Sequence, residues 1–202
     1  MTMTYCTRYT VELQCHPAIR APSVRGIQVQ VGWGQGGALA LTFSLTGDVV
    51  RLRIPTPQPS RRADGLWQHT CFEAFIRHEG EPGYYEFNFA PSGAWAAYAF
   101  SRYRDGAPLA QAVDPRIAVR RAEQQLELDA LIRLECLPLV PLCARLQLAL
   151  SAVIEDKQGV LSYWALTHPP GKPDFHHPDA FVLELERPEA TRVSDPAEGG
   201  KR

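Results

Sequence analysis

The sequence lacks the long apolar segments and the one-sided charge that mark membrane and nucleic-acid-binding proteins. No apolar run in its 202 residues approaches the roughly 18 residues that a membrane-spanning helix needs. The opening MTMTYCTRYT has neither the basic start nor the apolar core of a secretory signal. Lysine and arginine number 21 against 22 aspartate and glutamate, without a dense basic cluster. We therefore expect a cytoplasmic protein whose partner is neither a membrane nor a nucleic acid.

Signatures of covalent chemistry are also lacking. The five cysteines are odd in number and form no C-x-x-C pair, so we interpret them as reduced, mostly structural thiols. There is no G-x-S-x-G elbow, no G-x-x-x-x-G-K-[ST] loop and no G-x-G-x-x-G that opens a helix after a strand. Nucleophilic catalysis and phosphate binding through such a loop therefore have little support.

Apolar residues at every second position are the main pattern that is present, and this is the period of a half-buried strand. It is clearest over residues 146–154 and 124–135, while 27–31 and 39–45 read as a hairpin around the glycine-rich residues 32–37. Further strands are expected at 4–14, 49–54, 66–78, 84–90, 94–102, 115–122, 160–167 and 180–186. These many short strands predict an all-β sandwich or barrel, with at most a helical turn at 137–144.

The distribution of apolar residues along the chain predicts one domain followed by a polar tail. Residues 4–187 are expected to form one domain, a two-sheet antiparallel β-sandwich of jelly-roll or immunoglobulin-like type. Residues 188–202 are polar, contain proline and glycine, and offer little to bury. They are predicted to be a disordered C-terminal tail.

Two neighbouring segments place ionisable groups on one strand face. In GLWQHTCFEAFIRH, alternation puts Trp67, His69 and Glu73 on the face opposite Phe72. In YYEFNF, Glu86 and Asn88 likewise point away from the apolar face. Buried charges need a partner or a shifted pKa, so this shared face is either a binding site or a structural network. In the structural alternative, an arginine such as Arg77 or Arg102 neutralises each glutamate.

A third segment, YWALTHPPGKPDFHHPDAF, carries the densest group of polar side chains. A strand that ends at Thr167 leads into a loop whose four prolines restrict its backbone, which lowers the entropy cost of holding side chains for a ligand. The loop bears His168, Lys172, Asp174, His176 and His177. Three histidines invite a metal interpretation, but their spacing matches no zinc motif. Trp164, on the preceding strand, could join Trp67 as a platform for a flat ligand, or it could be core.

These three segments, with GAWAAYAF after the second, resemble the DOMON-like domains of bacteria, which are related to family-nine carbohydrate-binding modules and to haem-binding cytochrome domains. The resemblance covers about residues 10–186. It implies a two-sheet β-sandwich with a ligand cleft that binds a sugar or haem, with Trp67 in the position of a stacking residue. The sequence departs from the methionine–histidine haem pattern because its two methionines are Met1 and Met3. Haem would instead need two histidines, or a histidine with Lys172.

The leading hypothesis is a non-catalytic domain that recognises a carbohydrate or a sugar-containing metabolite. The expected ligand contacts are Trp67, His69, Glu73, Glu86, Asn88, Trp164, His168, Lys172, Asp174, His176 and His177. Two alternatives remain: a haem or metal site built on His168, His176 and His177, and an enzyme that uses Glu73 and Glu86 as a carboxylate pair. A protein partner is left open.

Overall fold

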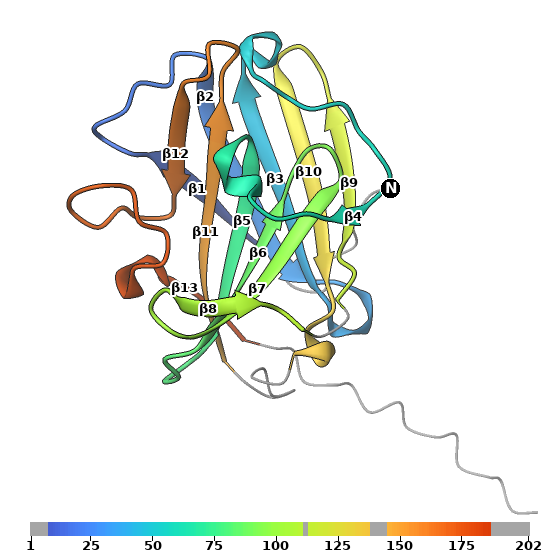
Figure 1. The fold of residues 1–202 in the computed structure, drawn as a ribbon, viewed down its shortest axis with the longest axis vertical. Coiled ribbons are helices and arrows are strands. Elements are labelled where there is room, and N and C mark those ends of the chain that lie inside the picture. The colour runs from blue at the N-terminus through green and yellow to red at the C-terminus, as the bar shows by residue number, and fades with distance from the viewer. Residues whose placement is uncertain (1–7, 111–112, 138–144, 187–202) are drawn as a thin grey trace, which may run out of the picture.

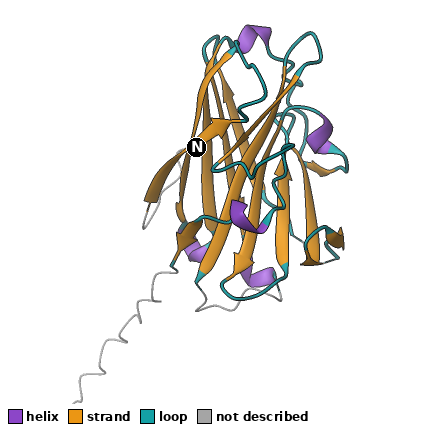
Figure 2. Cartoon of the chain, turned by 90° about the vertical axis from the view of Figure 1, so that its left-hand side faces the viewer, coloured by secondary structure: helices purple, strands orange, loops and turns teal. Residues whose placement is uncertain are grey.

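The computed structural model describes residues 8–110, 113–137 and 145–186 of the chain. Within these ranges strands dominate, and the only helices are short 3-10 turns in the connections (Figure 2). None of these helices is long and apolar enough to cross a membrane. The elements in chain order are β1 Arg8–Cys15, β2 Val24–Trp33, η1 Gln35–Gly37, β3 Leu39–Gly47, η2 Val49–Arg51, β4 Arg61–Arg62, η3 Leu66–Gln68, β5 Cys71–His78, β6 Tyr84–Phe89, β7 Ala94–Arg102, β8 Asp105–Pro108, β9 Arg116–Arg121, β10 Gln125–Ile132, η4 Leu134–Cys136, β11 Leu146–Glu155, β12 Leu161–Ala165, η5 Pro178–Ala180 and β13 Leu183–Leu185.

The strands of the described residues form one curled sheet rather than two separate ones (Figure 1). Its order is β4-β7-β6-β5-β11-β12-β1-β2-β3-β10-β9, with β8 beside β7 and β13 beside β11. Strand β1 joins the two halves, because its first six residues pair with β2 and its last two with β12. All pairs are antiparallel except β4 with β7. The all-β prediction is confirmed, whereas the predicted division into two sheets is not, because β1 pairs with strands of both halves.

The apolar core lies between the two halves of the curled sheet. Alternation directs Phe72 of β5 and Phe87 of β6 inward, where they meet residues such as Phe43 of β3 in one continuous cluster. The Phe43 and Phe72 rings are 5.1 Å apart. Trp33, also in this cluster, donates a 2.7 Å hydrogen bond from its indole nitrogen to the Glu186 carbonyl, which fastens the end of the described chain to the core. The opposite face of β5 and β6 is therefore turned away from the core.

Several predicted strand boundaries differ from the structure. Residues 49–51 form η2, and Leu52 makes only an isolated bridge to Asp156. Gly65, with φ of 75° in the left-handed region, turns the chain into η3, so Trp67 and His69 precede β5 instead of continuing it. The short strands β4 and β8 were not expected. Three predicted features lie wholly or partly outside the described residues: most of the helical turn at 137–144, the first four residues of the strand at 4–14, and the tail at 188–202.

Candidate functional site

A cavity of about 340 Å³ opens on the face of the β6-β5-β11-β12 half that is turned away from the core. Strands β5, β6, β11 and β12 supply its floor, while η3, β7 with the β7–β8 turn, and the loop after β12 supply its walls. The lining residues are Trp67, Glu73, Glu86, Tyr98, Phe100, Arg104, Val153, Tyr163, Pro173, Phe175 and His176. The cavity therefore combines five aromatic side chains with two carboxyl groups.

The sheet register brings the two carboxyl groups together. Glu73 of β5 lies opposite Asn88 of β6, and Glu86 lies two residues before Asn88 on the same face. Ser151 of β11 lies opposite Glu73 on its other side. All four residues are buried; Glu73 and Glu86 are only 2% and 6% exposed. The shared polar face expected from the sequence therefore forms the cavity floor.

Each glutamate has one short hydrogen bond from a neutral donor. The Asn88 side-chain amide donates to Oε1 of Glu86 over 2.7 Å. The Ser151 hydroxyl donates to Oε2 of Glu73 over 3.1 Å. The side-chain oxygen Oδ1 of Asn88 in turn accepts a 3.7 Å hydrogen bond from the Cys71 thiol. These contacts fix the side chains without neutralising their charge.

Burial controls the ionisation of this pair. Desolvation, and then repulsion from Glu86, raises the pKa of Glu73 to about 8, although the Ser151 hydrogen bond opposes the shift. Desolvation also raises the pKa of Glu86, against the opposing effects of Asn88 and Arg104. The pair therefore retains protons at pH values at which exposed glutamates have lost them.

Arg77 and Arg102 do not neutralise these carboxyls, which contradicts the structural alternative considered for them. Arg77 donates two hydrogen bonds to the Gln147 side chain and lies over the Phe181 ring. Arg102 forms an ion pair with Asp105. The floor of the cavity is thus acidic without an arginine paired to it.

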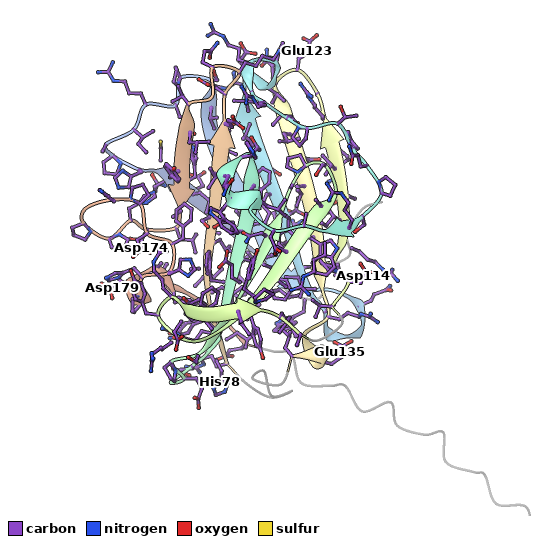
Figure 3. All side chains as sticks on the ribbon, viewed as in Figure 1. His78, Asp114, Glu123, Glu135, Asp174 and Asp179 are labelled. Atoms are coloured by element: carbon purple, nitrogen blue, oxygen red, sulfur yellow. The ribbon has the colours of Figure 1, made fainter. Side chains whose placement is uncertain are left out.

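A charged cluster at the β7–β8 turn forms one wall. Arg104, at a positive φ of 55°, donates from its guanidinium to Oδ1 of Asp174 over 2.8 Å. The Tyr103 hydroxyl donates to Oδ2 of Asp174 over 2.6 Å. Burial disfavours the Asp174 carboxylate, but these bonds outweigh that effect and hold its pKa below the usual value. Figure 3 labels Asp174 on the loop after β12, beside the β7–β8 hairpin that these bonds tie to it.

His176 faces Glu86 from the same loop. Its Nδ1 lies 2.9 Å from the Tyr84 hydroxyl, which already accepts the backbone N–H of Arg104 and so has its own proton free to donate. When Tyr84 donates to Nδ1, the His176 proton is on Nε2, which is 3.7 Å from Oε2 of Glu86. Desolvation and the Arg104 charge lower the pKa of His176 to about 4. His176 is consequently a neutral hydrogen-bond donor toward the cavity.

The aromatic rings stand around these polar groups. Trp67 of η3 is 44% exposed at the cavity, and its ring meets Tyr98 edge-on at 6.1 Å. Tyr163 of β12 lies 6.2 Å from Phe175 of the loop. An indole this exposed beside buried polar groups offers a flat apolar surface next to hydrogen-bonding atoms.

Four of the expected site residues line the cavity and two support it. Glu73, Glu86, Trp67 and His176 line it, while Asn88 and Asp174 hold lining residues in place. The other five predicted contacts are Trp164, His69, His168, Lys172 and His177, and the structure places them elsewhere.

Trp164 belongs to the core and not to the cavity. It lies opposite Ala152 of β11, is only 6% exposed, and donates from its indole to the Ser162 hydroxyl. Its neighbour Tyr163 lies opposite Val153 and lines the cavity instead. The correction has a simple cause, because adjacent strand residues point to opposite faces.

The remaining histidines have structural contacts. His69 Nδ1 lies 2.8 Å from Glu155, outside the cavity. His168 Nε2 lies 2.8 Å from the Gln14 carbonyl, and the His177 ring accepts the backbone N–H of Asp179 at the start of η5. Lys172 is exposed and does not line the cavity.

The three loop histidines therefore do not converge on a metal or a haem iron. Within residues 8–110, 113–137 and 145–186, no group of three or more His, Cys, Asp or Glu side chains is arranged to hold a metal ion. Among the described residues, His176 is the one histidine that lines the cavity, and its Nδ1 is in contact with the Tyr84 hydroxyl. Met1 and Met3 lie outside the described residues. This donor set does not fit a haem with two protein ligands, nor a metal centre.

Several lining residues were missed by sequence reasoning. Tyr98 and Phe100 share the parity of Glu86 through the β6–β7 register, so strand alternation could have identified them. Arg104 lies in a turn and is aligned by the left-handed backbone at that position, for which the sequence offered no signal. His16 was also missed: its Nε2 lies 3.1 Å from the Gly171 carbonyl, and its ring meets His168 edge-on, which fastens the loop to β1.

Comparison with known proteins identifies similar folds. No protein-family model matches the sequence, and no curated protein matches it. A structure described as a "putative carbohydrate-binding protein" from Bacteroides uniformis superposes with a TM-score of 0.62 at 14% identity, over 87% of this chain and 84% of that one. A family-nine carbohydrate-binding module from Caldicellulosiruptor kristjanssonii in complex with cellotriose gives 0.52 at 11% identity, over 94% and 89%. Its glucose complex gives 0.51 at 11%, over 92% and 88%. The chain shares the fold of these carbohydrate-binding proteins.

Proposed function

We propose that the cavity binds a carbohydrate or a sugar-containing metabolite without transforming it, and that the chain is a DOMON-like relative of the family-nine modules. The observation that carries this proposal is the exposed Trp67 indole beside buried Glu73 and Glu86. A sugar ring has an apolar face that stacks on an indole and hydroxyls that hydrogen-bond to carboxyl groups. The fold shared with modules that hold cellotriose and glucose supports the same ligand class.

The size of the cavity limits the ligand. Its volume of about 340 Å³ is at the lower end of the roughly 300–1,000 Å³ found for small-molecule sites. Trp67 is placed to stack on the ligand, while Glu73, Glu86 and His176 offer polar atoms to its hydroxyls. We therefore expect a mono- or disaccharide unit to fill the site.

The test is a Trp67→Ala variant measured by isothermal titration calorimetry against a panel of mono- and disaccharides. Loss of the stacking surface should weaken binding at least tenfold, equivalent to about 1.4 kcal/mol. The melting temperature should change little because the indole is half-exposed. Tyr9→Ala is the matched control, since Tyr9 is 41% exposed on β1 and does not line the cavity. Equal affinity of both variants and the unmodified protein for every sugar would overturn the proposal.

Glycoside hydrolysis is a second candidate, favoured by the raised pKa of Glu73, which would keep a general acid protonated near neutral pH. In this mechanism Glu73 protonates the leaving oxygen and Glu86 acts as nucleophile or base. Turnover of a nitrophenyl glycoside that is lost in both Glu73→Gln and Glu86→Gln would establish it. Binding without turnover of any glycoside would leave the non-catalytic function.

A further inference from the structure

The acidic pair in the cavity has no cation of its own among the described residues. Of the residues that the structure describes, Arg104 is the only positively charged one that lines the cavity, and its guanidinium contacts Asp174 and Tyr103. His176, the other basic group, is neutral because burial and Arg104 lower its pKa. The remaining titratable groups of the lining are the phenols Tyr98 and Tyr163. The two buried acids thus face a space whose one described cation, Arg104, is already paired with Asp174.

One carboxylate oxygen in this space is free to accept a hydrogen bond. Ser151 donates to Oε2 of Glu73, and none of the described residues donates to Oε1. Glu73 is nonetheless only 2% exposed, and it lines the cavity. Oε2 of Glu86 is similarly open, since its nearest basic atom, Nε2 of His176, is 3.7 Å away. Both oxygens belong to residues that line the cavity, so a ligand that brings hydrogen-bond donors would meet two acceptors there.

The aromatic rings of the same cavity favour the same kind of group. Trp67, Tyr98, Phe100, Tyr163 and Phe175 all line it. The faces of such rings carry partial negative charge and attract cations, most strongly where water is excluded. Carboxylates framed by aromatic rings therefore suit an organic cation better than a neutral hydroxyl.

We infer that the ligand carries a protonated amine, as an amino sugar does, and that this ammonium group binds between Glu73 and Glu86 while the sugar ring stacks on Trp67. This inference rests on the proposed function and specifies its substrate class. The ammonium donates to Oε1 of Glu73 and to Oε2 of Glu86, and its charge replaces the proton that the pair retains. A metal ion is less suited, because Ca²⁺ needs about six to eight oxygen ligands and the cavity floor offers two carboxyl groups.

The experiment compares matched probes on the full chain by calorimetry at pH 7. D-glucosamine is set against D-glucose and N-acetyl-D-glucosamine, which share the ring but lack the charge. Cyclohexylamine supplies an ammonium group without a sugar. Hydrogen bonds to charged groups contribute about 1.5–3 kcal/mol, so glucosamine should bind roughly tenfold to a hundredfold more tightly than either neutral sugar.

Substitutions test whether Glu73 and Glu86 cause the preference for glucosamine over the neutral sugars. Glu73→Gln and Glu86→Gln should each reduce the preference to less than threefold, and both should fold because they remove a buried ionisable group. Glu155→Gln is the matched control: Glu155 is a buried glutamate on β11 that is paired with Arg53 outside the cavity, so this variant should retain the full preference. A circular-dichroism melt of each variant verifies folding.

The outcomes separate this inference from the proposed function. If glucose and N-acetylglucosamine bind as tightly as glucosamine, the ammonium site is wrong while carbohydrate binding stands. If cyclohexylamine binds as tightly as glucosamine and Trp67→Ala has no effect, the ammonium site stands and carbohydrate recognition fails. Binding of none of the probes at millimolar concentration would overturn both.

Discussion

Two of the regions that hold buried carboxyl groups differ in the partners of those groups. On β10, Asp129 lies 2.6 Å from the Arg120 guanidinium and accepts the Thr42 hydroxyl over 2.7 Å. On β5 and β6, the donors that the described part of the chain places within hydrogen-bond distance of Glu73 and Glu86 are neutral. A buried charge is tolerated when it is paired and hydrogen-bonded, and otherwise it shifts its pKa. The first region is thus paired within the chain, whereas the carboxyls of the second have no ion pair with a lysine or arginine among the described residues.

Removing the arginine that pairs with Asp129 should produce the largest change in the free energy of unfolding. Arg120→Ala leaves Asp129 buried beside Thr42 with its charge uncompensated, and removal of one partner of a buried ion pair typically costs about 3–5 kcal/mol. Because the Arg120 side chain is 44% exposed, we expect a loss of about 3 kcal/mol. Urea unfolding at pH 7 measures it. A loss below about 1 kcal/mol would show that Asp129 does not depend on its arginine.

The unpaired region should respond in the opposite direction. Glu73→Gln should raise the free energy of unfolding at pH 9 by roughly 2 kcal/mol, because it removes a carboxylate that burial destabilises. A tenfold change in an acidity constant corresponds to about 1.4 kcal/mol. At pH 4, where the carboxyl is protonated in both folded and unfolded chains, the variant and the unmodified protein should be nearly equal. Asp129→Asn, in contrast, should be destabilising at pH 9.

The dependence of the unfolding free energy on pH in the unmodified protein also reports on the unpaired Glu73. The pKa of Glu73 is raised from 4.5 in the exposed chain to about 8 in the fold, so the folded state holds a proton that the unfolded state has released. Its contribution to stability is complete below about pH 4.5 and is lost as the pH rises toward 8. Unfolding free energies measured from pH 4 to 9 should therefore decline, and Glu73→Gln should flatten the decline. An equally steep decline in the variant would assign it to other groups.

Much of this contrast could be read from the sequence. Period-two alternation separates Phe72 from Glu73 and Phe87 from Glu86, and the structure confirms both assignments. What alternation cannot supply is the partner strand. That Ser151 lies opposite Glu73, and that Arg120 reaches Asp129 while Arg77 turns to Gln147, depends on register between segments far apart in the chain.

The site residues that were misplaced show where local reasoning fails. Trp164 was chosen for its chemistry, but strand parity directs Tyr163 to the cavity and Trp164 to the core. Three nearby loop histidines suggested a shared centre, yet each ring contacts a different part of the backbone or a different side chain. Loop conformation sets those directions, and residue type alone does not encode it.

Hydroxyl donors sharpen the comparison between the two regions. Thr42→Val removes a hydrogen bond to the paired Asp129 and should cost about 1.5–2 kcal/mol at pH 7, as expected for a bond to a charged group. Ser151→Ala removes the equivalent bond to Glu73 and should cost less than about 1 kcal/mol at pH 7, where Glu73 is largely protonated. Unfolding curves for both variants at pH 7 and pH 9 provide the measurement. Only the Ser151→Ala loss should grow with pH.

The smallest effect on stability is expected for a variant that frees Arg104 to act as a charged partner of Glu86, as Arg120 does for Asp129. Asp174→Asn removes the acid that holds Arg104, and this exposed ion pair contributes less than about 1 kcal/mol. The released guanidinium would remain near Glu86, whose pKa it already lowers, and would lower that pKa further. The decline of stability should then end at a lower pH than in the unmodified protein, and the preference for glucosamine over glucose should fall. Tyr103→Phe, which leaves the Arg104–Asp174 contact in place, is the control. An unchanged pH profile in Asp174→Asn would mean that Arg104 cannot serve as the missing partner of the acidic pair.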